Sequence, residues 1–219
     1  MSLFVNADGG LTTAGYAGCI ALIVILTAVL YFSQKSKASA HMSAKKIAFS
    51  SMCIALAAVT SMIKVYELPF GGSVTLCSML FAVLPGWIYG LSTGLLCGLI
   101  YGILQFVLGP YVMTPVQVLF DYIFAFMILG VSGIFSKKKN GLLTGYIVAV
   151  IGRWIMATIA GLVWVSLGST VWDGWAPLPY SMVYNISYIG LEALFTIIII
   201  CIPAVEKALN RIKKQALEN

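Results

Sequence analysis

The chain has 219 residues, of which 61% are hydrophobic and only 9% carry a charge. Soluble domains contain about 25% charged residues, so this composition excludes a water-soluble enzyme, and the apolar content excludes a disordered chain. The 13 Lys and Arg residues outnumber the 7 Asp and Glu residues, which gives a formal net charge of +6. In such a composition the basic excess indicates a membrane protein with its cations on one side, and no nucleic-acid partner.

Long apolar runs, interrupted by charges and by Gly and Pro clusters, predict seven membrane-spanning helices. A helix needs about 20 apolar residues to cross the hydrocarbon core of a bilayer. The runs are continuous and do not alternate at every second residue, which favours helices over the strands of a membrane barrel. We expect the spans near residues 13–33, 46–63, 74–90, 92–109, 116–135, 143–166 and 181–203.

These spans divide the chain into a compact membrane domain with an addition at each end. Residues 44–205 hold six spans and form the predicted all-α, polytopic core, and residues 206–219 form a basic cytoplasmic tail. Residues 1–43 add one N-terminal transmembrane helix and a cytoplasmic linker. No Lys or Arg precedes this first helix, whereas Lys35 and Lys37 follow it, so we expect a retained helix and not a cleaved signal peptide.

The distribution of charge predicts the orientation in the membrane. With the N-terminus outside and the C-terminus in the cytoplasm, the inner segments carry 11 of the 13 cations. These are Lys35, Lys37, Lys45, Lys46, Lys137, Lys138, Lys139, Lys207, Arg211, Lys213 and Lys214. The outer segments hold only Lys64 together with three acids, so the asymmetry follows the positive-inside rule.

Three ionisable residues remain inside the predicted spans, namely Asp121, Arg153 and Glu192. Such groups are costly in a membrane and are candidates for a functional site. Arg153 also has a structural interpretation, because it lies where its side chain can snorkel or bond to carbonyl groups. The five cysteines form no CxxC pair and His41 lies in a linker, so we expect no metal site, no cofactor and no Ser–His catalysis.

Aromatic side chains gather at the outer ends of the spans. Tyr180, Tyr184 and Tyr188 are four residues apart and share one helix face, with Asn185 on an adjacent stripe. Trp and Tyr also form the interfacial belt of ordinary membrane proteins, which is the alternative interpretation. Together with the Asp121 carboxylate, the aromatic faces predict an outward-facing pocket for a small, flat, cationic molecule.

Small residues at four-residue spacing predict close helix contacts. Gly90, Gly94, Gly98 and Gly102 form one such ladder, which suits packing within the domain. Ser51 and Ala55 give the second span a smooth surface. That surface suits either docking of another membrane subunit or packing within the chain. The sequence has no G-x-x-x-x-G-K-[ST] motif, so uphill transport would draw on an ion gradient or on a partner ATPase.

Several motifs in order resemble one family of vitamin-binding proteins. They read LPFGGSVT at 68–75, GLLCGLIYG at 94–102, LQF at 104–106, GPY at 109–111, DY at 121–122 and YSMVYNISY at 180–188. Over residues 44–205 the chain resembles the thiamine-specific S components of energy-coupling factor (ECF) transporters, the ThiT/YuaJ group. The resemblance implies a six-helix subunit that binds a vitamin from outside. Such a subunit docks on a shared transmembrane subunit with two cytoplasmic ATPases.

The resemblance also implies site residues. The family's loop tyrosine, its carboxylate and the tyrosine that follows match Tyr111, Asp121 and Tyr122, and its docking motif matches Ser51 and Ala55. The full expected pocket consists of Tyr111, Asp121, Tyr122, Trp164, Tyr180, Tyr184, Asn185 and Tyr188, with residues 64–74 as a lid. The family's binding histidine and tryptophan are replaced by Ala157 and Val165, with Trp164 adjacent, so a thiamine precursor or another heterocycle is an alternative ligand.

Two other functions remain open at this stage. A self-sufficient proton-coupled carrier would use Asp121 and Glu192 as relay groups. A scaffold or enzyme accessory without a transport function would fit the scarcity of polar groups, although it would leave the acidic and aromatic cluster unexplained.

Overall fold

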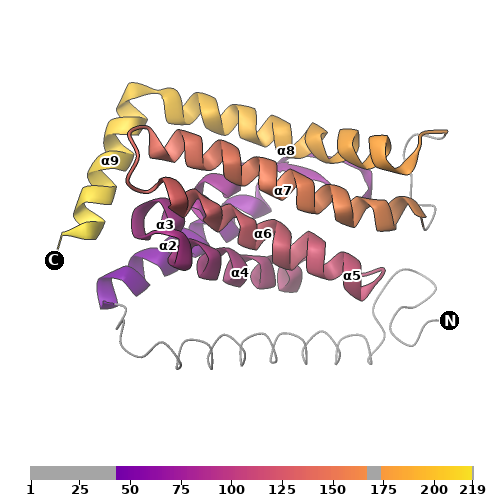
Figure 1. The fold of residues 1–219 in the computed structure, drawn as a ribbon, viewed down its shortest axis with the longest axis horizontal. Helices are drawn as coiled ribbons and strands as arrows, with labels where there is room; N and C mark the ends of the chain where they lie inside the picture. Colours follow the sequence, from indigo (N-terminus) through magenta and orange to yellow (C-terminus); the bar gives the residue numbers. More distant parts are fainter. Residues whose placement is uncertain (1–42, 167–173, 219) are drawn as a thin grey trace.

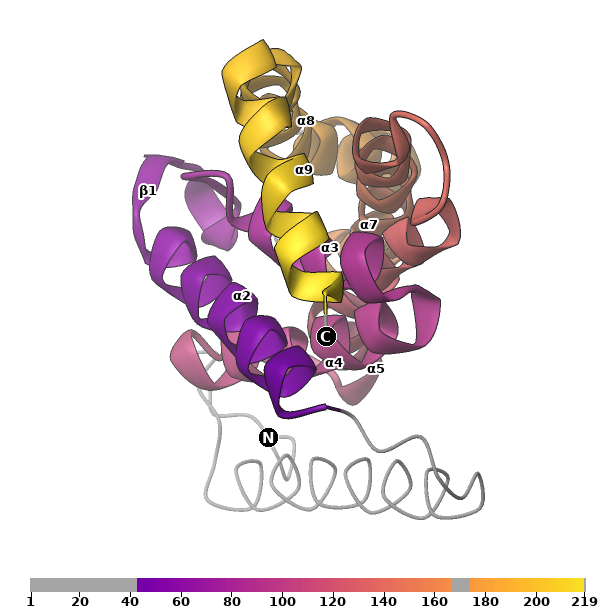
Figure 2. The same cartoon turned by 90° about the vertical axis from the view of Figure 1, so that its left-hand side faces the viewer.

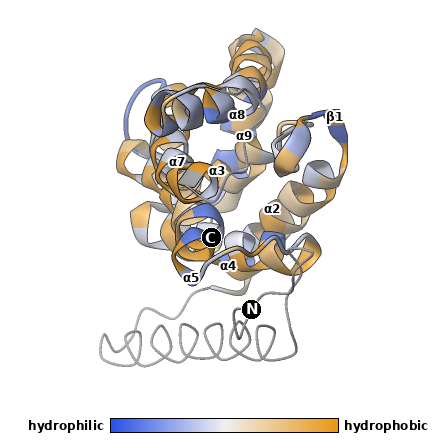
Figure 3. Ribbon diagram, turned by 90° about the vertical axis from the view of Figure 1, so that its right-hand side faces the viewer, coloured by the Kyte–Doolittle hydropathy of each residue, from blue (hydrophilic) through white to orange (hydrophobic). Residues whose placement is uncertain are grey.

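The computed structural model describes residues 43–166 and 174–218. The predicted N-terminal span, near residues 13–33, lies outside the described residues. The described part is a bundle of long helices that run roughly along one axis, with a further helix across one end (Figure 1). Apolar residues cover most of the outward surface of the bundle, as expected for a protein surrounded by lipid (Figure 3).

Six helical segments form this bundle. They are α2 (Ala44–Met62), α3 (Ser78–Tyr89), α4 (Leu91–Leu108), the segment from Pro115 to Phe135, α7 (Gly141–Ser166) and α8 (Pro177–Cys201). Five of the six are long and apolar enough to cross a membrane. The exception is α3, which has 12 residues and therefore a length of about 18 Å, against the roughly 30 Å of a bilayer core. The helical, polytopic architecture expected from the sequence is confirmed.

A short β-hairpin takes the place of the first turn of the predicted third span. Strand β1 (Lys64–Glu67) pairs antiparallel with β2 (Ser73–Thr75), and the turn between them contains the 3₁₀ segment η1 (Pro69–Gly71). Left-handed backbone at Phe70 and Cys77 ends the two extended segments, and a helix cannot continue through such residues. Helix α3 consequently begins at Ser78, four residues later than the apolar run suggests.

The segment from Pro115 to Phe135 changes its helical type along its length. It consists of α5 (Pro115–Val118), the π-helical η2 (Leu119–Phe124), α6 (Ala125–Met127) and the 3₁₀ segment η3 (Ile128–Phe135). Single π-turns inside helices often occur at functional sites. Here the π-turn contains Asp121 and Tyr122, two residues of the expected pocket.

Glycines of α4 bring this segment close to the rest of the bundle. A Cβ atom added at Gly102 would lie 2.2 Å from the Tyr122 carbonyl oxygen, and one at Gly98 would lie 2.5 Å from the Phe126 carbonyl oxygen. At Gly94 the nearest atom would be the Gly130 carbonyl oxygen at 2.5 Å. The three glycines therefore serve packing within the chain, which is the intramolecular interpretation of the ladder.

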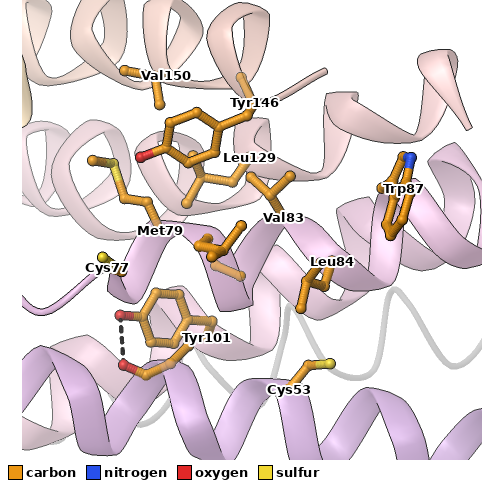
Figure 4. Close-up of a cluster of buried hydrophobic side chains, with 14 of the residues drawn as sticks. Cys53, Cys77, Met79, Val83, Leu84, Trp87, Tyr101, Leu129, Tyr146 and Val150 are labelled. Carbon is orange, nitrogen blue, oxygen red and sulfur yellow. Dashed lines mark hydrogen bonds between the residues drawn. The ribbon is translucent and has the colours of Figure 1, made fainter. Parts of the chain in front are cut away.

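The hydrophobic core lies around α3, in the middle of the bundle. Met79 and Val83 of α3 and Leu129 of η3 are completely inaccessible to solvent and pack with Tyr146 of α7 (Figure 4). The Tyr101 hydroxyl of α4 donates to the Ala57 carbonyl oxygen of α2 at 3.2 Å. This core fixes the positions of α2, α4 and α7 relative to one another.

Helix α9 (Pro203–Leu217) lies across the end of the bundle that is remote from the hairpin (Figure 2). The Lys213 ammonium donates to the Trp87 carbonyl oxygen at 2.9 Å and to the Ser136 carbonyl oxygen, at the ends of α3 and η3. Cations favour helix C-termini, where carbonyl groups lack partners within the helix. The basic tail is thus a helix attached to the bundle.

Candidate functional site

A cavity of about 440 Å³ opens between the hairpin and the helices α4, α7 and α8, a volume within the range of small-molecule sites. All eight residues that the sequence predicted for the pocket line this single cavity. They are Tyr111, Asp121, Tyr122, Trp164, Tyr180, Tyr184, Asn185 and Tyr188. The hairpin turn also lines it through Phe70, Gly71 and Gly72, so the predicted 64–74 loop lies over the pocket as an ordered hairpin.

Two groups of aromatic rings line the cavity. The ring of Tyr111 stacks on the Trp164 indole with centroids 4.3 Å apart and planes inclined by 16°, and Phe70 meets the same indole edge-on at 6.3 Å. On α8 the rings of Tyr180 and Tyr184 are nearly parallel, with centroids 6.1 Å apart. Such faces carry negative charge density and attract a flat cation.

The Asp121 carboxylate is held beside the Tyr111 and Trp164 stack. Gln117 Nε2 donates to Asp121 Oδ2 at 2.9 Å, and the carboxylate also interacts with the Trp164 side chain. Gln117 is fully buried, and its Oε1 accepts from the Met113 backbone N–H at 3.2 Å. Gln117 thus fixes both the acid and the loop before it. Gln117 is not among the residues predicted from the sequence, although it stands four residues before Asp121, which is the helical spacing for such a contact.

The Tyr122 hydroxyl is used to hold the Tyr111 loop. It accepts from the Tyr111 backbone N–H at 3.0 Å and donates to the Gly109 carbonyl oxygen at 2.9 Å. The ring of Tyr122 lines the cavity and packs edge-on against Phe106 at 5.1 Å. Tyr122 therefore offers its ring, and not its hydroxyl, to a bound molecule.

Asn185 joins α8 to α7 at the wall of the cavity. Its Nδ2 donates to the Ser181 carbonyl oxygen at 2.9 Å and to the Ala157 carbonyl oxygen at 3.2 Å, and its Oδ1 accepts from the Tyr188 hydroxyl at 2.8 Å. Since an amide has two N–H groups, both donors are engaged. Asn185 thus orients Tyr188, and the remaining lone pair of Oδ1 is the atom it can offer to a ligand.

Tyr184 connects the hairpin to α8. Its hydroxyl accepts from the Gly72 backbone N–H at 3.1 Å and donates to the Pro69 carbonyl oxygen. A Cβ atom at Gly72 would lie 2.8 Å from the Tyr184 hydroxyl and 2.9 Å from Tyr188 Cδ1, so this approach requires glycine. The hairpin turn is therefore held against two of the predicted site residues.

Glu192 has a structural function that the sequence did not reveal. Its Oε2 accepts from the backbone N–H and the hydroxyl of Thr75, at 3.2 and 2.7 Å. Its Oε1 accepts from the Ser78 hydroxyl at 3.1 Å and from the Met79 N–H at 3.0 Å. Helix α3 has no side-chain cap of its own, and Glu192 of α8 accepts from the Met79 N–H in its first turn. The carboxylate also lies at the positive end of the α3 dipole, which stabilises its negative charge. These four hydrogen bonds account for the presence of Glu192 inside an apolar span, and a function as a proton relay is not needed to explain it.

The predicted docking residues lie on the surface of α2. Ser51 and Ala55 are exposed, and Met52 and Leu56 beside them are 50% and 41% exposed. The opposite face of α2 packs into the core through Cys53, Ala57 and Ala58. Ser51 and Ala55 therefore make no part of the core, and their face is open to lipid or to a partner.

Comparison with known proteins decides the family. Residues 47–211 match the sequence profile of the family described as thiamine transporter protein (Thia_YuaJ). The chain belongs to this family. It is 34% identical over 150 residues to the thiamine transporter ThiT of Bacillus subtilis strain 168, which covers 62% of this chain and 77% of the relative. These relatives are named as transporters and not as enzymes.

A solved structure supports the fold independently. ThiT from Listeria monocytogenes superposes with a TM-score of 0.58 over 73% of this chain and 96% of its own, at 21% identity. At that identity the match speaks for the architecture alone. With five helices suited to a membrane and the family assignment, the chain is a multi-pass membrane protein.

Proposed function

We propose that this chain is the substrate-binding (S) subunit of an ECF-type vitamin transporter, and that it binds thiamine from outside the cell. The single observation that carries the proposal is the cavity in which the stacked rings of Tyr111 and Trp164 lie beside the Asp121 carboxylate. Thiamine has two flat rings, one of which is a permanent cation. Aromatic faces and a carboxylate are the groups that recognise such a molecule.

The charges of the cavity support a singly charged cation. Asp121 and Glu192 contribute two formal negative charges and Arg153 one positive charge, which leaves −1. Lys64, which also lines the cavity, pairs with Glu67 at 2.6 Å between Nζ and Oε1, and this pair has no net charge. A ligand of charge +1 would neutralise the site, whereas an anion would raise the cost of an already charged cavity.

The distribution of charge supports the proposal that the cavity opens on the outer side. The basic segments 136–142 and 203–217 lie at the end of the bundle that α9 covers, and the positive-inside rule assigns this end to the cytoplasm. The end of α5 lies at the opposite end of the bundle (Figure 1), and the hairpin and the Tyr111 loop line the same cavity. A ligand from outside therefore reaches the pocket without crossing the hydrophobic core.

Energy for import would come from partners, namely a shared transmembrane subunit with two cytoplasmic ATPases. Ser51 and Ala55 form the exposed face of α2 that is proposed to dock on the transmembrane subunit, because small residues let a neighbouring helix approach closely. Uptake by reconstituted protein should then require these partners and ATP. Uptake driven by a pH gradient without partners would instead support the proton-coupled carrier.

Titration of tryptophan fluorescence tests the ligand. Because Trp164 stacks on Tyr111 at the wall of the cavity, thiamine that binds against this stack is expected to quench the emission of Trp164. The separate pyrimidine and thiazole parts of thiamine, added in parallel, test the alternative of a precursor as the true ligand. If neither thiamine nor its parts changed the emission or raised the melting temperature, the proposed ligand would be wrong.

A further inference from the structure

Arg153 of α7 is a charged side chain inside the bundle whose partner is missing. Its Nη1 is buried and has no hydrogen-bond partner among the described residues. The ion pair found among those residues joins Lys64 to Glu67 and does not involve Arg153. Buried charged donors without an acceptor are strongly unfavourable, so a guanidinium in this state calls for an explanation.

Neighbouring carboxylates do not supply that explanation. Asp121 is hydrogen-bonded by Gln117, and Glu192 accepts from four donors of the segment that begins α3. The guanidinium instead lies 4.4 Å from the centre of the Phe126 ring, a cation–π contact that fixes its position without engaging its N–H groups. Other atoms of the Arg153 side chain line the cavity, so a rotation of the guanidinium would turn the unpaired Nη1 donor toward a bound molecule.

The position of Arg153 along α7 separates it from Trp164, although its charge still acts on Asp121. Arg153 and Trp164 both line the cavity and are 11 residues apart, which corresponds to about 16 Å along the helix. Ala157 and Gly161 lie between them and also line the cavity. The wall formed by α7 thus has a guanidinium at one end, small residues in the middle and an aromatic ring near Asp121 at the other.

We propose that Arg153 donates a hydrogen bond to a ring nitrogen of the ligand's neutral heterocycle and so determines how the ligand is oriented. This inference rests on the proposed function, in which the ligand is thiamine. The thiazolium cation is repelled by the guanidinium and attracted by Asp121, so it lies at the Trp164 end. The aminopyrimidine, which is uncharged and has unprotonated ring nitrogens, lies at the Arg153 end.

Two probes separate this function from a structural one. The first is 3-benzyl-5-(2-hydroxyethyl)-4-methylthiazolium, which keeps the cation and the hydroxyl of thiamine but has a benzyl ring in place of the aminopyrimidine. The second is 4-amino-5-hydroxymethyl-2-methylpyrimidine, which keeps only the neutral ring. Dissociation constants for thiamine and both probes are measured on the same preparations of wild type, Arg153→Met and Arg153→Lys. The matched control is Arg211→Met, on the exposed face of α9.

We expect Arg153→Met to weaken thiamine and the pyrimidine probe by about 10- to 100-fold, the effect of losing one charge-assisted hydrogen bond. The dissociation constant of the benzyl thiazolium should change by less than about threefold in Arg153→Met. For thiamine, the dissociation constant of Arg153→Lys should lie between those of wild type and Arg153→Met. Arg211→Met should bind all three ligands as wild type does. Because each comparison uses one preparation, partial misfolding would scale all ligands alike. An equal loss of affinity for all three ligands in Arg153→Met, or unchanged thiamine binding, would overturn the inference. Neither result would contradict the proposed function, which depends on thiamine binding by the wild type.

Discussion

Replacing Glu192 with glutamine removes the charge that caps α3 and exchanges one carboxylate oxygen for an NH₂ group. Each oxygen accepts from one hydroxyl and one backbone N–H, so whichever oxygen is exchanged, the new NH₂ faces both kinds of donor. The hydroxyl of Thr75 or Ser78 can rotate and accept instead. The backbone N–H of Thr75 or Met79 cannot, and it is left without an acceptor.

The size of the effect follows from these contacts. A buried donor without a partner costs about 1–3 kcal/mol, and the remaining bonds lose the advantage of an ionised acceptor. Glu192 itself is only 3% exposed, so water does not replace the lost contacts. We therefore expect Glu192→Gln to lower the free energy of unfolding by about 2–4 kcal/mol. For a domain of this size that corresponds to a melting temperature lower by roughly 5–15 °C.

Thermal unfolding of the purified protein in detergent, followed by tryptophan fluorescence, measures this loss. Glu206→Gln is the matched control, because Glu206 lies exposed in the first turn of α9. A proton relay at Glu192 predicts the opposite pattern, with an unchanged melting temperature and loss of uptake. An unchanged melting temperature in Glu192→Gln would refute the capping argument, whatever the effect on uptake.

Three further substitutions test other parts of the structure. In Gly102→Val the new Cβ atom would lie 2.2 Å from the Tyr122 carbonyl oxygen, so the π-turn that contains Tyr122 should be displaced. We expect thiamine binding, measured by fluorescence titration, to weaken at least tenfold. Tyr184→Phe removes both contacts to the hairpin turn and should speed thiamine dissociation about 5- to 150-fold in stopped-flow measurements, because each lost bond contributes about 0.5–1.5 kcal/mol. An unchanged dissociation rate would contradict a function of Tyr184 in holding the hairpin over the pocket. Ala55→Trp should leave thiamine binding intact but abolish partner-dependent uptake, and normal uptake would exclude this face as the docking site.

The sequence predicted the location of the site because membrane depth and helical spacing restrict the positions of side chains. Tyr180, Tyr184 and Tyr188 recur every fourth residue, so a single α8 brings them to one face. Asp121 was conspicuous because carboxylates are rare in apolar spans. Both signals are local, and in the structure these side chains line one cavity.

Features that depend on contacts between distant segments were not predicted from the sequence. Glu192 caps a helix that begins 114 residues earlier, and nothing in its own span indicates that partner. The apolar run from residue 74 reads as a membrane span, whereas in the structure it begins with strand β2, whose Thr75 is bound by Glu192 of α8. For the same reason Asn185 was assigned only to the pocket, although its two N–H donors also join α7 to α8.

The two ends of the bundle differ in a way that limits how a ligand can leave. Ser78 of α3 lines the cavity, and Met79 and Val83, which follow it along the helix, are completely buried. One turn further on, Trp87 accepts from Lys213 of α9, whose ammonium also lies 4.3 Å from the centre of the Trp87 ring. A passage from the cavity to the α9 end would have to separate this close-packed layer. Release on that side therefore requires rearrangement or reorientation of whole helices, since no fixed pore through the described bundle is compatible with this packing.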